Sequence, residues 1–306
     1  MRSPTALDGP NASRFQLPPG PWTTVLDALC AAFPAVPRAV WVSRFERGRV
    51  LDGAHGPLAV DAAFRAGEQV RYFREVEDEP PLPVRETVLH HDDDLLVVDK
   101  PHFLPVTPAG RFVEQTLLVR LMHRFDNREL APLHRIDRLT AGLMLFSTRP
   151  ATRPQYQALF RERRIRKRYE AIAPPLPDAV FPLERVTRIA PGEPFFRMRE
   201  VDGEANSRTR VDVLEHGAAA WRYALEPITG RKHQLRVHMA ALGAPIVGDP
   251  LYPQLLEPAA DDFDRPLRLL ARALEFDDPL DGRPRRFESA LRLAMPDAEV
   301  SAGRAD

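Results

Sequence analysis

His134-Arg135-Ile136-Asp137-Arg138-Leu139-Thr140-Ala141-Gly142-Leu143-Met144-Leu145-Phe146 places one carboxylate between two arginines, in a polar turn directly before an apolar run. The run at 143–146 is short and continuous, with glycine before it and polar residues after it, which predicts a buried strand. We therefore expect Asp137 at the end of a sheet, with Arg135 and Arg138 beside it. Neighbouring cations favour the ionised carboxylate, which suits a nucleophile or a general base. An isolated Asp-Arg pair would more often be a structural ion pair.

This stretch resembles the central motif of the RluA-type RNA pseudouridine synthases, H-R-L-D-x-x-T-S-G-L-L-L-F, with Ile136 for Leu and Ala141 for Ser. Four further segments resemble the family's other motifs in the family's order. These are 94–106, with its strand ending in Lys-Pro; 167–171, which matches K-x-Y-x-A; 230–252, which matches G-R-T-H-Q-I-R-V-H-L…G-D-x-L-Y; and 269–287, the closing strand. The likeness spans about residues 86–290. It departs at Phe103 for Gly, at Lys232 for Thr and at Asp278-Pro279 for His-Pro.

The resemblance implies an α+β pseudouridine synthase fold and the isomerisation of uridine to pseudouridine in structured RNA. It assigns Asp137, Tyr169 and Arg236 to catalysis. Arg236 would pair with Asp137, and a guanidinium orients a carboxylate by two parallel hydrogen bonds that lysine cannot reproduce. The ring of Tyr169 would stack on the uracil, and its hydroxyl is a candidate for moving the proton at C5.

The resemblance also places Arg135 in the RNA stack when the target nucleotide leaves it. An arginine plane can replace lost stacking and also bind phosphate. The other expected RNA contacts are His134, Leu235, Arg138, Thr140, Lys100, Arg166 and Lys167.

Charge is unevenly distributed, although the 43 basic and 43 acidic residues balance. Residues 120–170 hold 13 Arg and Lys against five Asp and Glu, whereas residues 75–99 hold nine acids against one base. The basic run at 161–168 precedes Tyr169 and is either a phosphate-binding surface or only a solvated helix face. The expected partner is structured RNA, with large-subunit ribosomal RNA favoured and transfer RNA possible.

No cofactor, metal or membrane is expected. The chain lacks a Walker-type loop and a G-x-G-x-x-G motif. His233 and His238 would diverge by about 140° around a helix, and adjacent residues such as 90–94 rarely converge on one ion. No apolar run approaches the ~18 residues of a membrane helix, and the single Cys30 fits a reducing cytoplasm. We expect a cytoplasmic monomer.

Five segments are expected along the chain: a disordered arm at 1–21, a small module at 22–76, an acidic and proline-rich linker at 77–85, the catalytic domain at 86–295 and a flexible tail at 296–306. The module resembles the RNA-binding fold that many relatives share with a ribosomal small-subunit protein. In it we expect helices at 25–33 and 41–45 and a strand at 70–73.

In the catalytic domain, strands are expected at 95–98, 143–146, 169–172, 208–214 and 221–226, and helices at 115–123, 152–161 and 232–242. The last two strands form a hairpin through Gly217, and Gly243 caps the last helix. Strands outnumber helices without strict βαβ alternation, which favours an α+β fold with a largely antiparallel sheet flanked by helices. On the last helix Leu235 and Met239 share the core face, whereas Arg236 lies on another face and could point into a cleft.

Alternatives stay open for the reaction route and for the class of protein. Asp137 could attack C1′, attack C6 of the ring or take the C2′ proton. The chain could also be a non-catalytic RNA-binding or ribosome-assembly factor on the same scaffold. A glycosidase is disfavoured because it would need a second carboxylate about 5–10 Å away, and the sequence around Asp137 offers only cations.

Overall fold

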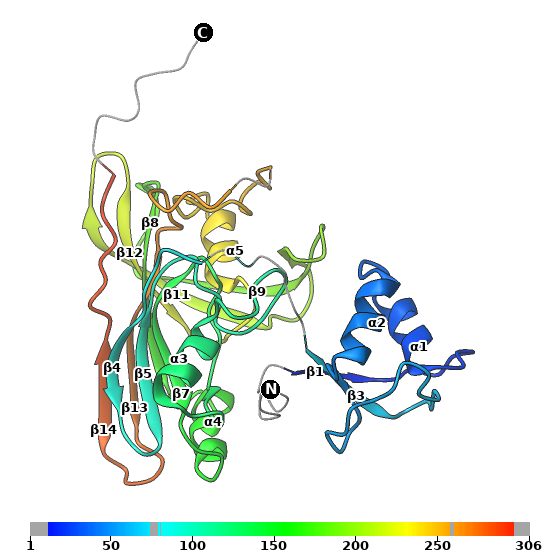
Figure 1. The fold of residues 1–306 in the computed structure, drawn as a ribbon. Helices are drawn as coiled ribbons and strands as arrows, with labels where there is room; N and C mark the ends of the chain where they lie inside the picture. Colours follow the sequence, from blue (N-terminus) through cyan, green and yellow to red (C-terminus); the bar gives the residue numbers. More distant parts are fainter. Residues whose placement is uncertain (1–11, 74–78, 80, 258–259, 297–306) are drawn as a thin grey trace. The chain divides into compact units, whose positions relative to one another are not determined.

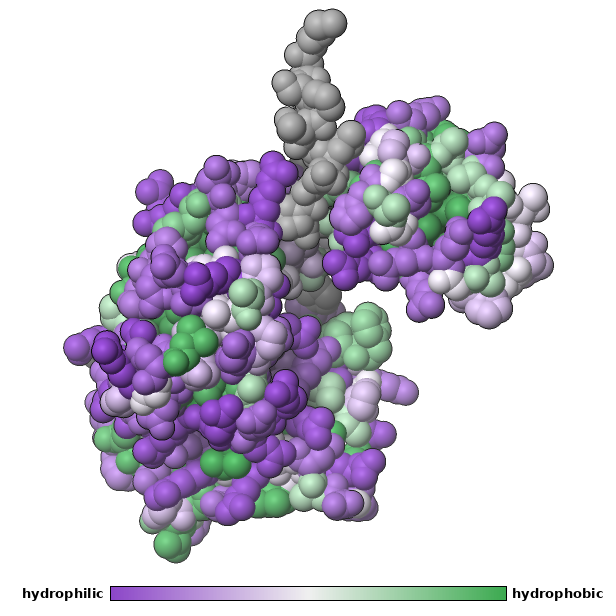
Figure 2. Space-filling model, turned by 90° about the horizontal axis from the view of Figure 1, so that it is seen from below, coloured by the Kyte–Doolittle hydropathy of each residue, from purple (hydrophilic) through white to green (hydrophobic). Residues whose placement is uncertain are grey.

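A computed structural model of the chain describes residues 12–73, 79, 81–257 and 260–296. The chain divides into two compact units (Figure 1 and Figure 2). One comprises Met1–Pro80 with Pro108–Glu114, and the other comprises Pro81–Thr107 with Gln115–Asp306. The predicted boundaries of the module, the linker and the catalytic domain remain predictions.

In the smaller unit, two helices pack on a three-stranded antiparallel sheet of order β1-β3-β2. The strands are β1 (Ala12–Gln16), β2 (Val50–Leu51) and β3 (Gln69–Phe73), and the helices are α1 (Val25–Ala32) and α2 (Arg38–Glu46). The expected helices and the strand at 70–73 are confirmed. Thr24 caps α1 by accepting a hydrogen bond from the Asp27 N–H at 3.1 Å.

The predicted disordered arm at 1–21 is wrong for residues 12–16. They form β1, which pairs with β3 along its whole length. The Phe15 ring lies 5.0 Å from the Phe33 ring, so this strand buries an aromatic side chain. Residues 1–11 lie outside the described part of the chain.

The larger unit contains an eleven-stranded sheet of order β10-β9-β11-β12-β8-β13-β7-β5-β4, with β14 on β13 and β6 on β7. Among the described strands, only β13 and β7 pair in parallel, so the expected α+β fold with a largely antiparallel sheet is confirmed. The strands are β4 (Thr87–His91), β5 (Leu95–Lys100), β6 (Ala131–Pro132), β7 (Ala141–Ser147), β8 (Arg166–Ala173), β9 (Leu183–Pro191), β10 (Met198–Val201), β11 (Ser207–His216), β12 (Trp221–Pro227), β13 (Leu269–Asp277) and β14 (Pro284–Glu288). The helices are α3 (Leu117–Phe125), α4 (Arg153–Arg161) and α5 (Gln234–Ala241).

The apolar runs in β5 and β7 follow from a sheet that is covered on both faces. Leu96 and Met144 pack with α3 in one cluster, whereas Leu95 and Leu143 pack with α4 in another. Successive side chains point to opposite faces of a strand, so the runs at 95–98 and 143–146 must be apolar at every position. A third cluster packs α5 against β8, β11 and β12.

All expected strands and helices of this domain are present, within two or three residues at their ends. β4, β6, β9 and β10 were not predicted, and the closing strand expected at 269–287 is divided into β13 and β14. Almost all positions of the four unpredicted strands are half-buried or exposed, so no apolar run marks them.

Gly142 allows the turn that holds Asp137 to join the sheet. It has φ +106°, and a Cβ there would lie 2.3–2.8 Å from backbone atoms of Ala271, its partner across the parallel β7–β13 pair. Only glycine combines this backbone conformation with so close an approach.

We expect Gly142→Ala to lower the free energy of unfolding by about 2 kcal/mol or more beyond Gly243→Ala. Gly243 also has positive φ, at +87°, but open space around the missing Cβ. The control therefore isolates the clash from the backbone strain. Chemical denaturation measures both variants, and equal losses would contradict the packing argument.

Candidate active site

Asp137 lies in a turn between β6 and β7. The Thr140 N–H closes the turn by donating to the Asp137 backbone carbonyl at 3.1 Å. The carboxylate side chain is 29% exposed, so one side of it faces the protein and the other can meet a substrate.

Arg236 holds Asp137 from the buried side. Its Nη1 donates to Asp137 Oδ2 at 3.0 Å, while Nε and Nη2 donate to the two oxygens of Asp249 at 2.8 and 2.7 Å. Burial opposes the charge of Arg236, but Asp249 and Asp137 outweigh it and raise its pKa. Arg236 is only 2% exposed. Its position on the helix did not predict this burial. Its guanidinium is surrounded by carboxylates and not by apolar side chains.

His233 and Tyr252 complete the buried side of the site and were not predicted there. His233 Nε2 lies 3.8 Å from Asp137 Oδ1, and its Nδ1 lies 2.9 Å from the Tyr252 hydroxyl. The Tyr252 ring stands 5.4 Å from the Arg236 guanidinium. His233 has φ +57°, a strained conformation that is common at functional sites.

Tyr169 is half-buried in β8 and packs against the cluster beneath α5. Burial and then the charge of Asp137 raise the pKa of Tyr169, so its hydroxyl keeps its proton at neutral pH. The Asp137 charge acts on both Arg236 and Tyr169. An ion pair therefore joins Asp137 and Arg236, and Tyr169 lies within range of the Asp137 charge.

The two arginines that flank Asp137 in sequence do not flank it in space as expected. Arg138 turns away and forms a bidentate pair with Asp261, with both bonds at 2.8 Å. Arg135 is exposed and has no ion pair or hydrogen bond within the described residues. The cation that contacts Asp137 is Arg236, because neighbouring residues of a tight turn point in different directions.

Lys100 lies below the surface in this structure, and its contact with RNA remains a prediction. It is fully buried, and its ammonium donates to the carbonyls of Pro101, Leu104 and Arg138 at 2.9–3.0 Å. Burial lowers its pKa to about 7, and Asp137 opposes this shift. Lys100 therefore ties the end of β5 to the turn that holds Asp137.

Three other predicted RNA contacts support the fold. His134 Nε2 accepts a hydrogen bond from the Leu145 N–H at 3.1 Å, and its ring stacks on Phe160. Thr140 and Leu235 are buried, at 2% and 7% exposed. Their contact with RNA remains a prediction.

The basic residues before Tyr169 differ in how accessible they are. Arg166 is exposed and pairs with Glu226 at 2.8 Å. Lys167 is half-buried, and its Nζ donates to the Thr229 carbonyl at 3.3 Å. Burial and the charge of Arg163 lower the pKa of Lys167 to about 8.

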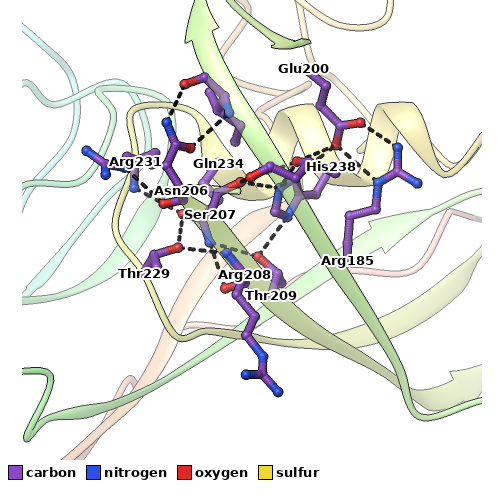
Figure 3. Close-up of polar contacts among 12 residues, drawn as sticks. Arg185, Glu200, Asn206, Ser207, Arg208, Thr209, Thr229, Arg231, Gln234 and His238 are labelled. Carbon is purple, nitrogen blue, oxygen red and sulfur yellow. Dashed lines mark hydrogen bonds and ion pairs between the residues drawn. The ribbon is translucent and has the colours of Figure 1, made fainter. Parts of the chain in front are cut away.

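A buried polar network anchors α5 to strands β9 and β11 (Figure 3). The His238 ring lies 3.0 Å from Ser207 Oγ, 3.1 Å from Thr187 Oγ1 and 2.9 Å from Thr209 Oγ1. Gln234 Nε2 donates to Thr209 Oγ1 at 2.9 Å. These bonds fix the rotation of the helix that carries Arg236.

Within the described ranges, no cluster of three His, Cys, Asp or Glu residues could hold a metal ion. In the same ranges no helix has the length and hydropathy needed to cross a bilayer.

Comparison with known proteins defines the class. The fold matches the structure of human RNA pseudouridylate synthase domain-containing 1, with a TM-score of 0.53, 27% identity and coverage of 72% of this chain and 86% of that chain. The family model for RNA pseudouridylate synthases matches residues 94–241.

Two curated relatives show which family of RNA pseudouridine synthases the chain resembles. An uncharacterized RNA pseudouridine synthase of Synechocystis is 35% identical, covering 70% of this chain and 74% of the relative. The dual-specificity RNA pseudouridine synthase RluA of Escherichia coli K12 is 33% identical, covering 69% and 95%. Two other curated relatives are longer, and the chain spans 32% of each. The chain belongs to the RluA-type RNA pseudouridine synthases, which are isomerases that act on RNA.

We expect Asp249→Asn to lower the free energy of unfolding by about 3–5 kcal/mol, because it leaves a buried guanidinium without its main partner. The control is Asp261→Asn, which breaks the Arg138 pair. The Arg138–Asp261 pair is also bidentate, but its side chains are 30% and 13% exposed. The side chains of Arg236 and Asp249 are only 3% and 1% exposed. We expect the control to cost about 1 kcal/mol or less. Denaturant titration tests both, and equal costs would show that the buried pair is not the stronger constraint.

We expect stability to fall as the pH drops from about 6.5 toward 4. Burial lowers the pKa of His134 to about 3 and those of His102, His233 and His238 to about 4. The unfolded chain binds these protons below its ordinary histidine pKa, whereas the folded chain does not, so acid favours unfolding. Burial raises the pKa of Asp99, so this one group stabilises the folded chain as the pH falls. Its effect opposes that of the four histidines. Unfolding free energies at several pH values test this, and a flat profile would contradict it.

Proposed function

We propose that this protein converts uridine to pseudouridine in structured RNA and that Asp137 initiates the reaction. The observation that carries the assignment is the Asp249–Arg236–Asp137 chain of ion pairs. It holds one carboxylate in a fixed orientation with an exposed side. A preorganised carboxylate of this kind costs no reorganisation at the moment of reaction.

The chemistry needs no external group. The N1–C1′ bond breaks, the uracil rotates, C5 bonds to C1′, the C5 proton leaves and N1 gains a proton. Asp137 could attack C1′, attack C6 or remove the C2′ proton, and its geometry suits each route. In every route Arg236 stabilises the carboxylate, and Tyr169 supplies an aromatic face for the uracil. The Tyr169 hydroxyl, protonated at neutral pH, is the candidate for the proton transfer at C5.

We further propose that the target nucleotide leaves the RNA stack and that Arg135 takes its place. Extrusion of a base costs a few kcal/mol. Arg135 is exposed and unpaired within the described residues, so its guanidinium is available to stack on bases or to bind phosphate.

We propose large-subunit ribosomal RNA as the first substrate to test and transfer RNA as the second. The relative from Escherichia coli carries the description dual-specificity, which supports testing both. The cytoplasmic location and the monomeric state stay predictions.

We expect Asp137→Asn to reduce turnover by at least about a thousandfold, since it removes the initiating group. RNA affinity should stay within a few-fold. Release of tritium from C5 of labelled uridine measures turnover, and filter binding measures affinity. The control is Asp93→Asn, an exposed carboxylate with no side-chain hydrogen bond in the described region, which should keep full activity.

Full turnover by Asp137→Asn would refute the catalytic assignment. If the wild-type protein bound RNA but converted no uridine, the alternative of a non-catalytic RNA-binding factor on this scaffold would replace the proposal.

A further inference from the structure

The hairpin of β9 and β10 ends in two adjacent aromatic side chains that the catalytic site does not use. Phe195 is 86% exposed and Phe196 is 37% exposed. Phe195 is the most exposed large hydrophobic side chain in the described part of the chain. The two rings meet edge to face, with centroids 5.6 Å apart. Exposed apolar groups placed side by side indicate a binding function more than scattered single ones do.

The tip is attached to the active site through Tyr252. The Tyr252 hydroxyl accepts a hydrogen bond from the Met198 N–H at 2.7 Å and lies 2.9 Å from His233 Nδ1. The Arg197 guanidinium stands 5.2 Å from the Tyr252 ring and donates to the Pro253 carbonyl at 3.0 Å. The residues that flank the tip are therefore fixed to the residue that contacts His233 and Arg236.

The base of the hairpin is attached to the catalytic helix independently (Figure 3). Arg185 of β9 pairs with Glu200 of β10. Thr187 of β9 contacts the fully buried His238 of α5 at 3.1 Å and donates to Glu200 at 3.1 Å. Two separate sets of contacts thus make the hairpin and the helix that carries Arg236 one rigid unit.

The charges on the hairpin do not favour phosphate as the ligand. The exposed bases Arg188 and Arg199 stand among the exposed acids Glu193, Asp202 and Glu204. Without a local excess of positive charge, electrostatic attraction to an RNA backbone is weak. The aromatic faces are the chemistry that the tip offers.

We propose that Phe195 and Phe196 form a platform on which a base of the substrate RNA stacks, outside the target nucleotide. This rests on the proposed function. Unpaired bases stack on exposed aromatic rings with little sequence preference. The chain of contacts from Asp137 through His233, Tyr252 and Met198 puts the tip within about 25 Å of the catalytic carboxylate. An RNA of about 16 base pairs, the length that a double-stranded RNA-binding domain contacts, is long enough to reach both places.

A protein partner fits the tip less well. Two phenylalanines bury at most about 500 Å², whereas a stable protein interface buries about 800 Å² on each partner. The rigid attachment to α5 also has a direct use for RNA, because it sets the distance between a stacked base and the reacting uridine.

The test is the double variant Phe195→Ala with Phe196→Ala, compared with Val180→Ala. Val180 is 85% exposed and lies outside the hairpin. Binding to stem-loop RNA with unpaired flanking bases should weaken about tenfold or more, with KM rising in parallel. The turnover number at saturating RNA should stay within about twofold, and the melting temperature should be unchanged. The double variant Phe195→Trp with Phe196→Trp should keep the wild-type affinity.

Two further measurements distinguish this proposal from its alternatives: the salt dependence of binding, and binding by variants that also carry Asp137→Asn. The slope of log Kd against log salt should be unchanged in the alanine variant, because no phosphate contact is lost. Binding is also measured with Asp137→Asn in every variant, so the platform is tested even if the wild-type protein converts no uridine. Unchanged Kd and KM in the alanine variant would overturn the proposal, as would a concentration-dependent dimer that the alanine variant abolishes.

Discussion

One buried guanidinium organises the active site. Arg236 is removed from water, and two carboxylates offset the lost solvation of its charge and raise its pKa. Asp249 occupies two of its nitrogens, and the geometry of the planar fork leaves a third directed at Asp137. The position of the Asp137 carboxylate, which we propose initiates the reaction, is therefore set by the Arg236–Asp249 ion pair, which does not need to contact the substrate. Any change that moves Arg236 moves Asp137 as well.

The rest of the domain holds the two ends of this ion-pair chain. At one end, Gly142 lets the turn that holds Asp137 enter the sheet against Ala271, and Lys100 ties the Arg138 carbonyl to the end of β5. At the other end, His238 fixes α5 to the sheet. A sheet covered on both faces supplies the rigidity, since cores packed at crystal density do not yield to small displacements. Precise geometry at one carboxylate thus depends on contacts spread over most of the domain.

The sequence predicted most of this, and the misses have physical causes. Continuous apolar runs located β5 and β7, and the motifs located Asp137, Tyr169 and Arg236. The sequence could not show that Lys100 is caged by carbonyls or that Arg138 pairs with Asp261, because both depend on segments brought together by the fold. Asp249 and Tyr252 lay within a quoted motif but received no role. Strands such as β9, whose positions are mostly half-buried or exposed, lack an apolar run, although the turn between β9 and β10 carries the exposed rings of Phe195 and Phe196.

The basic residues of this chain are not equally available to RNA. Arg236 and Lys100 are buried, and Arg138 is bound to Asp261. Exposed arginines of the run at 161–168 share Glu162 and Glu226 as partners. A count of basic residues therefore overstates the number of positive charges that can bind RNA phosphates. The chain as a whole has as many acidic as basic residues. Recognition must then depend more on shape and on stacking than on counterion release. The proposed contacts of this kind are Arg135, which has no ion pair or hydrogen bond within the described residues, and the exposed rings of Phe195 and Phe196. They would meet one RNA at two separate points.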